Sequence, residues 1–158
     1  MKYPAYVGID PGAGGGIAVL DRRGRYDKAV PLKAFDRAEL LTFLRTTGGV
    51  AQIELVTGFV GGTGFKAGSS AMFNFGVGYG LLLGFLLASG LPFEKVHPNV
   101  WQRRLGVPPR GRRETKTDYK NRLKDFAAGL FPAVKVTHAT ADALLIATHC
   151  YRKHSGKL

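Results

Sequence analysis

A short apolar segment that ends in a carboxylate does most to restrict the fold of this chain. Residues 5–10 suit a buried β-strand that closes on Asp10, and Pro11 and Gly12 then end it. Three glycines at 14–16 turn the backbone into a second apolar segment. A carboxylate held at a strand end can bind a metal ion, or it can accept a hydrogen bond from its own backbone in an Asx-type turn. Asp10 alone leaves both interpretations open.

The composition predicts one basic domain over residues 1–158. The 158 residues are 45% hydrophobic, which is enough to build one core. The single cysteine, Cys150, excludes a disulfide framework and a cysteine-based zinc site. No secretory signal peptide is recognisable at the N-terminus, so a reducing cytoplasm is the expected location.

The positive charge is concentrated in one segment. Lys and Arg number 23 against 11 Asp and Glu, which gives a formal net charge of +12. Residues 100–124 hold nine of the basic residues and only two of the acidic ones. A concentrated basic patch is expected where a protein binds the phosphate backbone of a nucleic acid, although a solvated helix surface would look the same.

Apolar spacing and turn residues predict an alternating order of elements. β-Strands are expected at residues 5–10, 16–21, 26–32, 51–56 and 92–97. Helices are expected from Asp36 to about Arg45 and at residues 69–89, 99–105, 116–130 and 140–153. Antiparallel strands first, followed by strands that alternate with helices, indicate an α/β fold with a mixed sheet and helices on its faces.

Residues 69–90 carry no charge and are long enough to cross a membrane. Asn74 and several serines and glycines dilute this segment, and it lies between two expected strands of one domain, so we expect no membrane partner. Gly76, Gly80 and Gly84 recur every four residues and place a smooth stripe on one helix face. The stripe predicts a helix buried on most sides, either by core packing or by dimerisation.

Two further acidic residues stand in apolar surroundings. Glu54 lies within an expected strand, where a charge is costly unless it is paired, bound to metal or turned toward water at an edge. Asp142 lies in an apolar helix, four residues after His138, and either complements the helix dipole or shares one face with that imidazole. With Asp10 and a basic surface, these residues predict a divalent-metal site for phosphodiester hydrolysis.

Short motifs also follow one another in a characteristic order along nearly the whole chain. They are Gly8-Ile9-Asp10-Pro11-Gly12, Ile53-Glu54, Ser70, Phe75-Gly76, Gly80, Gly84, Val96-His97-Pro98, Trp101, Lys120, Leu130-Phe131-Pro132 and Ala141-Asp142-Ala143-Leu144-Leu145-Ile146-Ala147. In these motifs the chain resembles the RuvC-type Holliday junction resolvases of the ribonuclease-H-like nuclease superfamily, especially their small phage and bacterial branch. The resemblance implies a ribonuclease-H-like mixed five-stranded sheet flanked by helices.

The resemblance also implies a catalytic metal site. It places metal ligands at Asp10, Glu54 and Asp142, and it places His138 at a fourth position where many relatives carry an aspartate and others a histidine. Two Mg²⁺ ions per site, for which Mn²⁺ can substitute, would bridge the scissile phosphate. The implied protein is a homodimer that makes paired symmetric nicks across a four-way DNA junction and leaves 5′-phosphate ends. Its implied location is the cytoplasm of a bacterium or of a phage-infected cell.

Six residues are expected to contact DNA. Arg112, Arg113, Lys116 and Lys120 would hold backbone phosphates. Phe59 and Phe65 would stack on unpaired bases at the junction centre or anchor their glycine-rich loop in the core. Trp101 is expected in the core.

Two other functions are consistent with the sequence. One is a nuclease of the same fold that acts on other branched or RNA-containing substrates, because no motif encodes the shape of the substrate. The other is a non-catalytic relative that binds branched DNA, in which His138 marks the loss of an acid. The three acids at 10, 54 and 142 favour an enzyme. No motif indicates a cleavage preference or a branch-migration motor as a partner.

Overall fold

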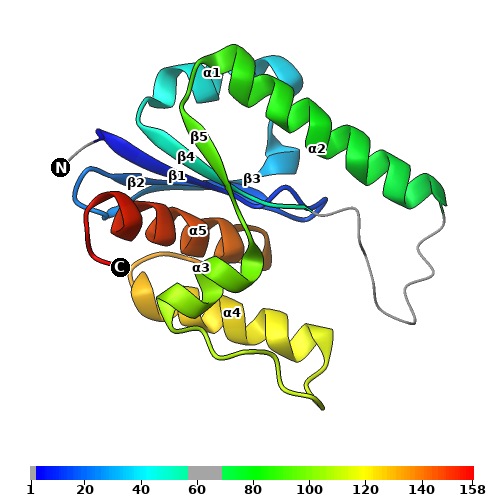
Figure 1. The fold of residues 1–158 in the computed structure, drawn as a ribbon, viewed down its shortest axis with the longest axis vertical. Coiled ribbons are helices and arrows are strands. Elements are labelled where there is room, and N and C mark those ends of the chain that lie inside the picture. Colours follow the sequence, from blue (N-terminus) through cyan, green and yellow to red (C-terminus); the bar gives the residue numbers. More distant parts are fainter. Residues whose placement is uncertain (1–2, 57–68) are drawn as a thin grey trace.

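Five β-strands form one mixed sheet at the centre of the computed structural model, which describes residues 3–56 and 69–158 (Figure 1). In chain order they are β1 (Ala5–Ile9), β2 (Gly16–Asp21), β3 (Tyr26–Pro31), β4 (Val50–Glu54) and β5 (Phe93–Val96). Their order across the sheet is β3-β2-β1-β4-β5. β1, β2 and β3 pair antiparallel, whereas β1, β4 and β5 pair parallel. The predicted mixed five-stranded sheet is confirmed.

Helices cover both faces of this sheet. They are α1 (Arg37–Thr47), α2 (Ser69–Ser89), α3 (Pro98–Leu105), α4 (Lys116–Leu130) and α5 (His138–His154), with a 3-10 helix, η1 (Leu32–Ala34), before α1. α1 and α2 lie on one face, and α5 lies on the other, where α3 and α4 pack against it (Figure 1). The predicted α/β arrangement with flanking helices therefore holds.

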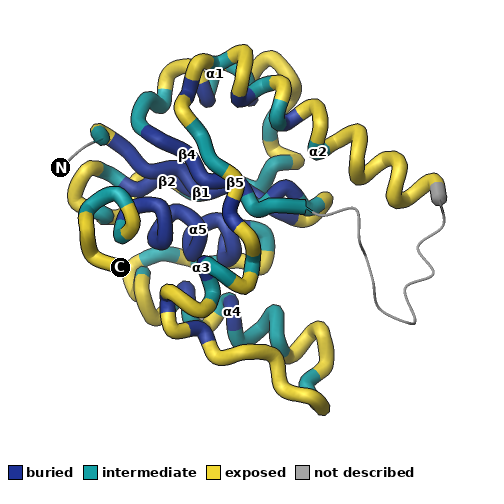
Figure 2. The backbone as a smooth tube through the Cα atoms, in the orientation of Figure 1, coloured by how far each residue is buried: buried dark blue, intermediate teal, exposed yellow. Residues whose placement is uncertain are grey.

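The alternation of side chains along β1 supplies both halves of the core. Val7 and Ile9 face α1 and α2, whereas Tyr6 faces α5. Both sides are apolar because helices cover both faces of the strand. Figure 2 shows the central strands and α5 buried together.

Gly8 lets β1 and α5 approach until their backbones touch. A Cβ atom at Gly8 would lie 2.1 Å from the carbonyl oxygen of Ala143 and 2.2 Å from the amide nitrogen of Ala147. Only glycine avoids this clash. Every residue of α5 from 140 to 151 is buried. The close contact fixes the N-terminal part of α5, including Asp142, next to the end of β1.

The predicted strands and helices are all present, with ends shifted by a few residues. Asp36 and Glu39 form the predicted capping box at the start of α1. α5 begins at His138 rather than at residue 140, so His138 and Asp142 lie on successive turns of one helix. This meets the condition under which both side chains share a helix face.

The prediction that residues 69–89 form a helix buried on most sides is wrong for this chain alone. α2 contacts the core through Leu82 and Leu86 near its C-terminal end, while its N-terminal half is exposed (Figure 2). A Cβ atom added at Gly76, Gly80 or Gly84 would meet nothing within 4 Å. The glycine stripe therefore faces open space. Within residues 3–56 and 69–158, α2 is the one helix whose length and composition would allow it to cross a membrane.

Candidate metal centre and nucleic-acid interface

Asp10 and Glu54 stand at the carboxyl ends of two neighbouring parallel strands. Ile9 of β1 is paired with Ile53 of β4, and each isoleucine is followed by an acid. Parallel strands bring their carboxyl ends to the same edge of a sheet, so the register itself places these two carboxylates side by side. Residues 44 positions apart in the sequence thus reach one site.

The Gly-rich turn after β1 closes around Asp10. Oδ1 of Asp10 accepts a 3.0 Å hydrogen bond from the amide of Gly12, which is the Asx-type contact expected of a structural aspartate. At Gly15 a Cβ atom would lie 2.2 Å from the carbonyl oxygen of Asp10, so the turn needs glycine there. The contact holds the Asp10 carboxylate in place and leaves Oδ2 without a partner among the described residues. The Asx-type interpretation is confirmed, and metal binding by Asp10 stays a prediction.

Asp142 completes the cluster of acids from α5. It is buried, and its Oδ2 atom forms an ion pair with Nζ of Lys120 on α4. Oδ1 of Asp142 is buried as well and has no hydrogen-bond partner in the part of the chain that the structure describes. A buried carboxylate oxygen without a partner is costly and calls for a cation or a donor.

The three acids repel one another across a site that is largely shielded from water. Burial raises the pKa of Asp10, and the charge of Asp142 raises it further. Burial together with the charges of Asp10 and Asp142 raises the pKa of Glu54 to about 7. Lys120 opposes both shifts because its ammonium group lies among the acids. This site has more negative charge than one lysine can balance, which is the condition a divalent cation would relieve.

Trp101 orients the second acid. Its indole Nε1 donates a 3.0 Å hydrogen bond to Oε2 of Glu54, and its ring is completely buried in α3. The predicted core position is confirmed, but the bond to Glu54 was not foreseen. The two residues are 47 positions apart, and no local pattern in the sequence relates them.

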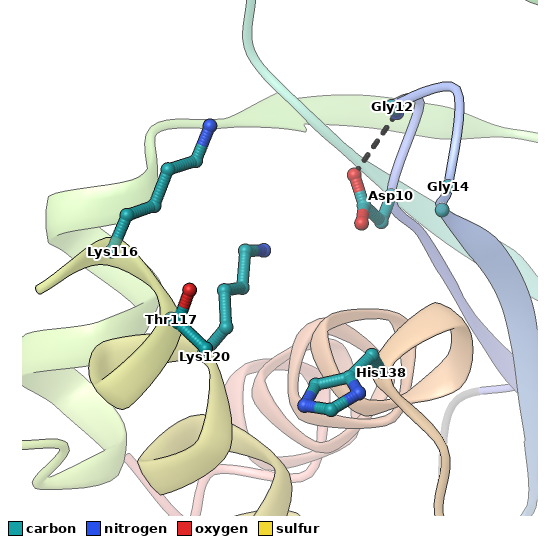
Figure 3. A pocket seen from close by; sticks show the side chains of 8 residues that line it. Asp10, Gly12, Gly14, Lys116, Thr117, Lys120 and His138 are labelled. Atoms are coloured by element: carbon teal, nitrogen blue, oxygen red, sulfur yellow. Dashed lines mark hydrogen bonds between the residues drawn. The ribbon is translucent and has the colours of Figure 1, made fainter.

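A pocket of about 540 Å³ opens beside Asp10 (Figure 3). Its lining is Asp10, Gly12, Gly14, Gly15, Lys116, Thr117, Lys120 and His138. Lys116 and Lys120 reach it from successive turns of α4, and Figure 3 shows Lys120 extending toward Asp10. The carboxylate of Asp10 on one wall and the two lysines on the other suit a phosphate group that shares a site with a metal ion.

His138 lines the same pocket and is tied to α4. Its Nε2 atom lies 2.8 Å from Oδ1 of Asn121. Because an amide oxygen only accepts, Nε2 carries the proton in the neutral ring, and Nδ1 keeps a free lone pair. The structure places His138 near the acids, and its role as a ligand or base stays a prediction.

The donor set fits a hard divalent cation. Among the described residues, no three His, Cys, Asp or Glu side chains are positioned to bind one metal ion together as they stand, and Lys120 occupies one oxygen of Asp142. The second oxygen of Asp142 is nevertheless buried and unpaired, and all three acids offer oxygen ligands. Carboxylate oxygens are the ligands that Mg²⁺ and Mn²⁺ accept.

The remaining predicted DNA contacts divide into two groups. Arg112 and Arg113 are exposed in the segment that leads into α4, so they are free to meet a ligand. Phe59 and Phe65 lie outside the residues that the structure describes.

The fold has close counterparts among solved structures. No family model matches this chain, and no curated protein matches its sequence. A structure of Thermus thermophilus RuvC matches with a TM-score of 0.61 and 17% identity over 97% of each chain. A second structure, T. thermophilus RuvC in complex with a Holliday junction substrate, matches with a TM-score of 0.62 and 18% identity over 97% of this chain and 96% of that one. This protein therefore has the ribonuclease-H-like fold of the RuvC-type Holliday junction resolvases.

Proposed function

We propose that this protein is a metal-dependent endonuclease that resolves four-way DNA junctions. The observation that carries the proposal is the meeting of three acids, from β1, β4 and α5, beside a pocket lined by two lysines. Such a site attracts a divalent cation to its acids and a phosphate to its lysines. Metal and phosphate at one place are what phosphodiester hydrolysis requires.

Asp10, Glu54 and Asp142 would hold two Mg²⁺ ions, with Mn²⁺ as a substitute. When bound, the metal would activate the attacking water and stabilise the leaving oxygen. The amide of Gly12 and the indole of Trp101 hold Asp10 and Glu54 in position, so these two ligands need little reorganisation. Nζ of Lys120 would release Asp142 and bind a phosphate oxygen of the substrate instead. The products would carry 5′-phosphate and 3′-hydroxyl ends.

Branched DNA is the substrate class that we favour. One of the RuvC structures of the same fold is a complex with a Holliday junction substrate. Lys116 lines the pocket beside the acids, and Arg112 and Arg113 are exposed just before it in the chain. These cations would follow the phosphate backbone away from the scissile bond. Phe59 and Phe65 would stack on bases at the junction centre.

A homodimer formed through α2 would supply the second active site. The helix exposes large apolar side chains that this chain alone does not cover: Met72, Phe73, Phe75, Val77, Leu81 and Leu87. Exposed apolar clusters of this kind mark interaction surfaces. The open glycine stripe would let two copies of α2 pack closely. Two active sites in one dimer would make paired symmetric nicks across a junction.

A comparison of substrates tests the proposal. The protein would be incubated with a mobile four-way junction, a fork, an RNA-containing duplex and a linear DNA duplex, each with Mg²⁺ or with a chelator. We expect paired nicks in the junction with Mg²⁺ only. Faster cleavage of the fork or the RNA-containing duplex would identify a nuclease of the same fold with another substrate. Junction binding without cleavage of any substrate in Mg²⁺ would identify a non-catalytic relative.

A further inference from the structure

Residues 111–114 form a β-turn that displays two unpaired arginines. The amide of Glu114 donates to the carbonyl of Gly111 at 3.1 Å, and Arg112 and Arg113 are the corner residues between them. Both arginines are exposed, and neither forms a hydrogen bond or ion pair within the described part of the chain. Two adjacent guanidinium groups therefore project from one tight turn immediately before α4.

The carboxylate of Glu114 closes this turn from inside. Oε2 accepts a 3.0 Å hydrogen bond from the amide of Gly111. The guanidinium of Arg122 binds both carboxylate oxygens, with Nε to Oε1 and Nη2 to Oε2 at 2.9 Å each. Paired charged hydrogen bonds of this kind are strong and directional. Arg122 lowers the pKa of Glu114 to about 2, so the carboxylate stays ionised at neutral pH.

Arg122 also holds the segment that leads into the turn. Its Nη1 atom donates to the carbonyl of Pro108 at 2.9 Å, and Nη2 donates to that of Pro109 at 3.2 Å. The guanidinium lies 5.0 Å from the ring centre of Tyr119, whose hydroxyl donates to Gln102 of α3 at 2.8 Å. One arginine thus ties the basic loop to two helices of the fold.

We propose that Glu114 and Arg122 are positioning residues that hold Arg112 and Arg113 in place for DNA phosphates before DNA arrives. The proposal rests on the proposed function, since it assumes a nucleic-acid ligand. A loop ordered in advance loses less conformational entropy on binding. The hydrogen bonds of Glu114 with Arg122, called the brace below, would therefore raise the affinity for DNA without touching the DNA. Glu114, one of only two acids in the basic segment, would then aid the binding of a polyanion.

The test uses two variants that break the brace and one that does not. Glu114→Gln removes the carboxylate charge and the paired charged hydrogen bonds with Arg122. Arg122→Lys keeps the positive charge but loses the paired hydrogen bonds. Asp125→Asn removes one charge from the same helix at an exposed residue that pairs with no described residue. Each is also made together with Arg112→Gln and Arg113→Gln. Binding to a four-way junction and to a linear duplex is measured at fixed salt with a chelator present, and circular dichroism checks the fold.

We expect Glu114→Gln and Arg122→Lys to weaken binding to either DNA about three- to tenfold, whereas Asp125→Asn leaves it unchanged or tighter. Net charge alone predicts that Glu114→Gln tightens binding. In the background without Arg112 and Arg113, neither brace variant should weaken binding further.

The proposal is overturned if Glu114→Gln and Arg122→Lys fold and bind DNA as the wild type does. It is also overturned if these two changes still weaken DNA binding in the background that lacks Arg112 and Arg113. If the wild type binds junction no better than duplex, the junction proposal fails while the duplex measurements still decide the brace. If it binds neither DNA, both proposals fail.

Discussion

Trp101 donates its indole hydrogen bond to Glu54 across 3.0 Å and joins α3 to the end of β4. The bond lowers the pKa of Glu54, yet burial and the charge of Asp10 outweigh it and raise that pKa to about 7. The repulsion among these acids therefore destabilises the folded protein when no metal is bound. A bound cation would relieve the repulsion and stabilise the fold.

The raised pKa of Glu54 predicts a pH-dependent stability penalty in chelator. Between about pH 4.5 and about pH 7 the folded state binds more protons at Glu54 than the unfolded state, so this residue's contribution to stability falls as the pH rises through that window. Replacing Glu54 by Gln removes the titration. The free energy of unfolding of the variant minus that of the wild type should grow by on the order of 3 kcal/mol from the lower to the upper limit.

Urea unfolding of both proteins at several pH values would measure this difference. Taking the difference cancels titrations that both proteins share, such as that of His149, whose pKa burial lowers to about 4. A difference that does not depend on pH would show that Glu54 ionises normally.

Loss of any one acid should abolish cleavage and spare binding. In Asp10→Asn, Glu54→Gln and Asp142→Asn the metal loses a ligand, while the phosphate-binding cations remain. Removing negative charge should leave junction affinity equal or higher, because these acids only repel phosphates. Gel assays with Mg²⁺ for cleavage and with chelator for binding would measure both. Cleavage at the wild-type rate by Asp10→Asn would rule out the metal assignment.

Lys120 should compete with the metal, whereas Lys116 should not. Nζ of Lys120 pairs with Asp142, while Lys116 lines the pocket without an ion pair among the described residues. Lys120→Met leaves the acids without a counter-charge, so the metal-free protein should lose about 1–2 kcal/mol of stability. Removing a cation beside the ligands should tighten Mn²⁺ binding about fivefold or more.

Calorimetric Mn²⁺ titration and urea unfolding would compare Lys120→Met with Lys116→Met. Both variants should weaken junction binding, and the double variant should flatten the logarithmic salt dependence by about two units. Equal metal affinity in the two single variants would mean that Lys120 does not compete. An unchanged salt slope would mean that this face of α4 does not meet DNA.

Local patterns were enough to predict the five strands and to single out the acids. Asp10 was expected at the end of its strand, and it directly follows β1. Glu54 was expected inside a strand of residues 51–56, whereas β4 ends at Glu54, and the parallel register that brings the two acids to one edge was not predicted. Asp142 could be singled out as a candidate because it is the one acid in a helix that is otherwise apolar at its start.

Contacts between distant residues escaped prediction because no local spacing encodes them. Trp101 was expected in the core, but its bond to Glu54 depends on how α3 packs against the sheet. The exposure of α2 was missed for a different reason. An apolar helix with a glycine stripe has the same sequence whether it packs in its own core or against a second copy.

Gly80→Leu should convert a dimer into a monomer without harming the fold. Gly80 is exposed and has open space where a side chain would stand, so leucine fits the isolated chain but blocks close approach of a second α2. Gly129→Leu on α4 is the matched control, because Gly129 is also an exposed helical glycine with open space. Both changes improve helix propensity, so both variants should melt at or slightly above the wild-type temperature.

Sedimentation equilibrium of the three proteins would measure the dimer. We expect dimers for the wild type and Gly129→Leu and monomers for Gly80→Leu, which should make single rather than paired nicks. A dimer of unchanged strength in Gly80→Leu would place the interface elsewhere. A wild type that is monomeric both free and on a junction would contradict paired nicking but not the metal chemistry.

His138 should make the enzyme favour Mn²⁺ over Mg²⁺. Its Nε2 atom bonds to Asn121, which leaves Nδ1 free to bind a metal or to take a proton from water, and Mn²⁺ accepts nitrogen ligands more readily than Mg²⁺. His138→Asp should gain activity with Mg²⁺, because a carboxylate supplies the oxygen ligand that Mg²⁺ prefers.

Cleavage rates with Mg²⁺ and with Mn²⁺ would measure this effect in the wild type, in His138→Asp and in Asn121→Ala, which removes the hydrogen-bond partner of the ring. If His138 only packs beside the site, His138→Asp will leave the ratio of the two rates unchanged. Asn121→Ala should then leave the ratio unchanged as well. If His138 is a metal ligand, the loss of its orienting partner Asn121 should weaken metal binding.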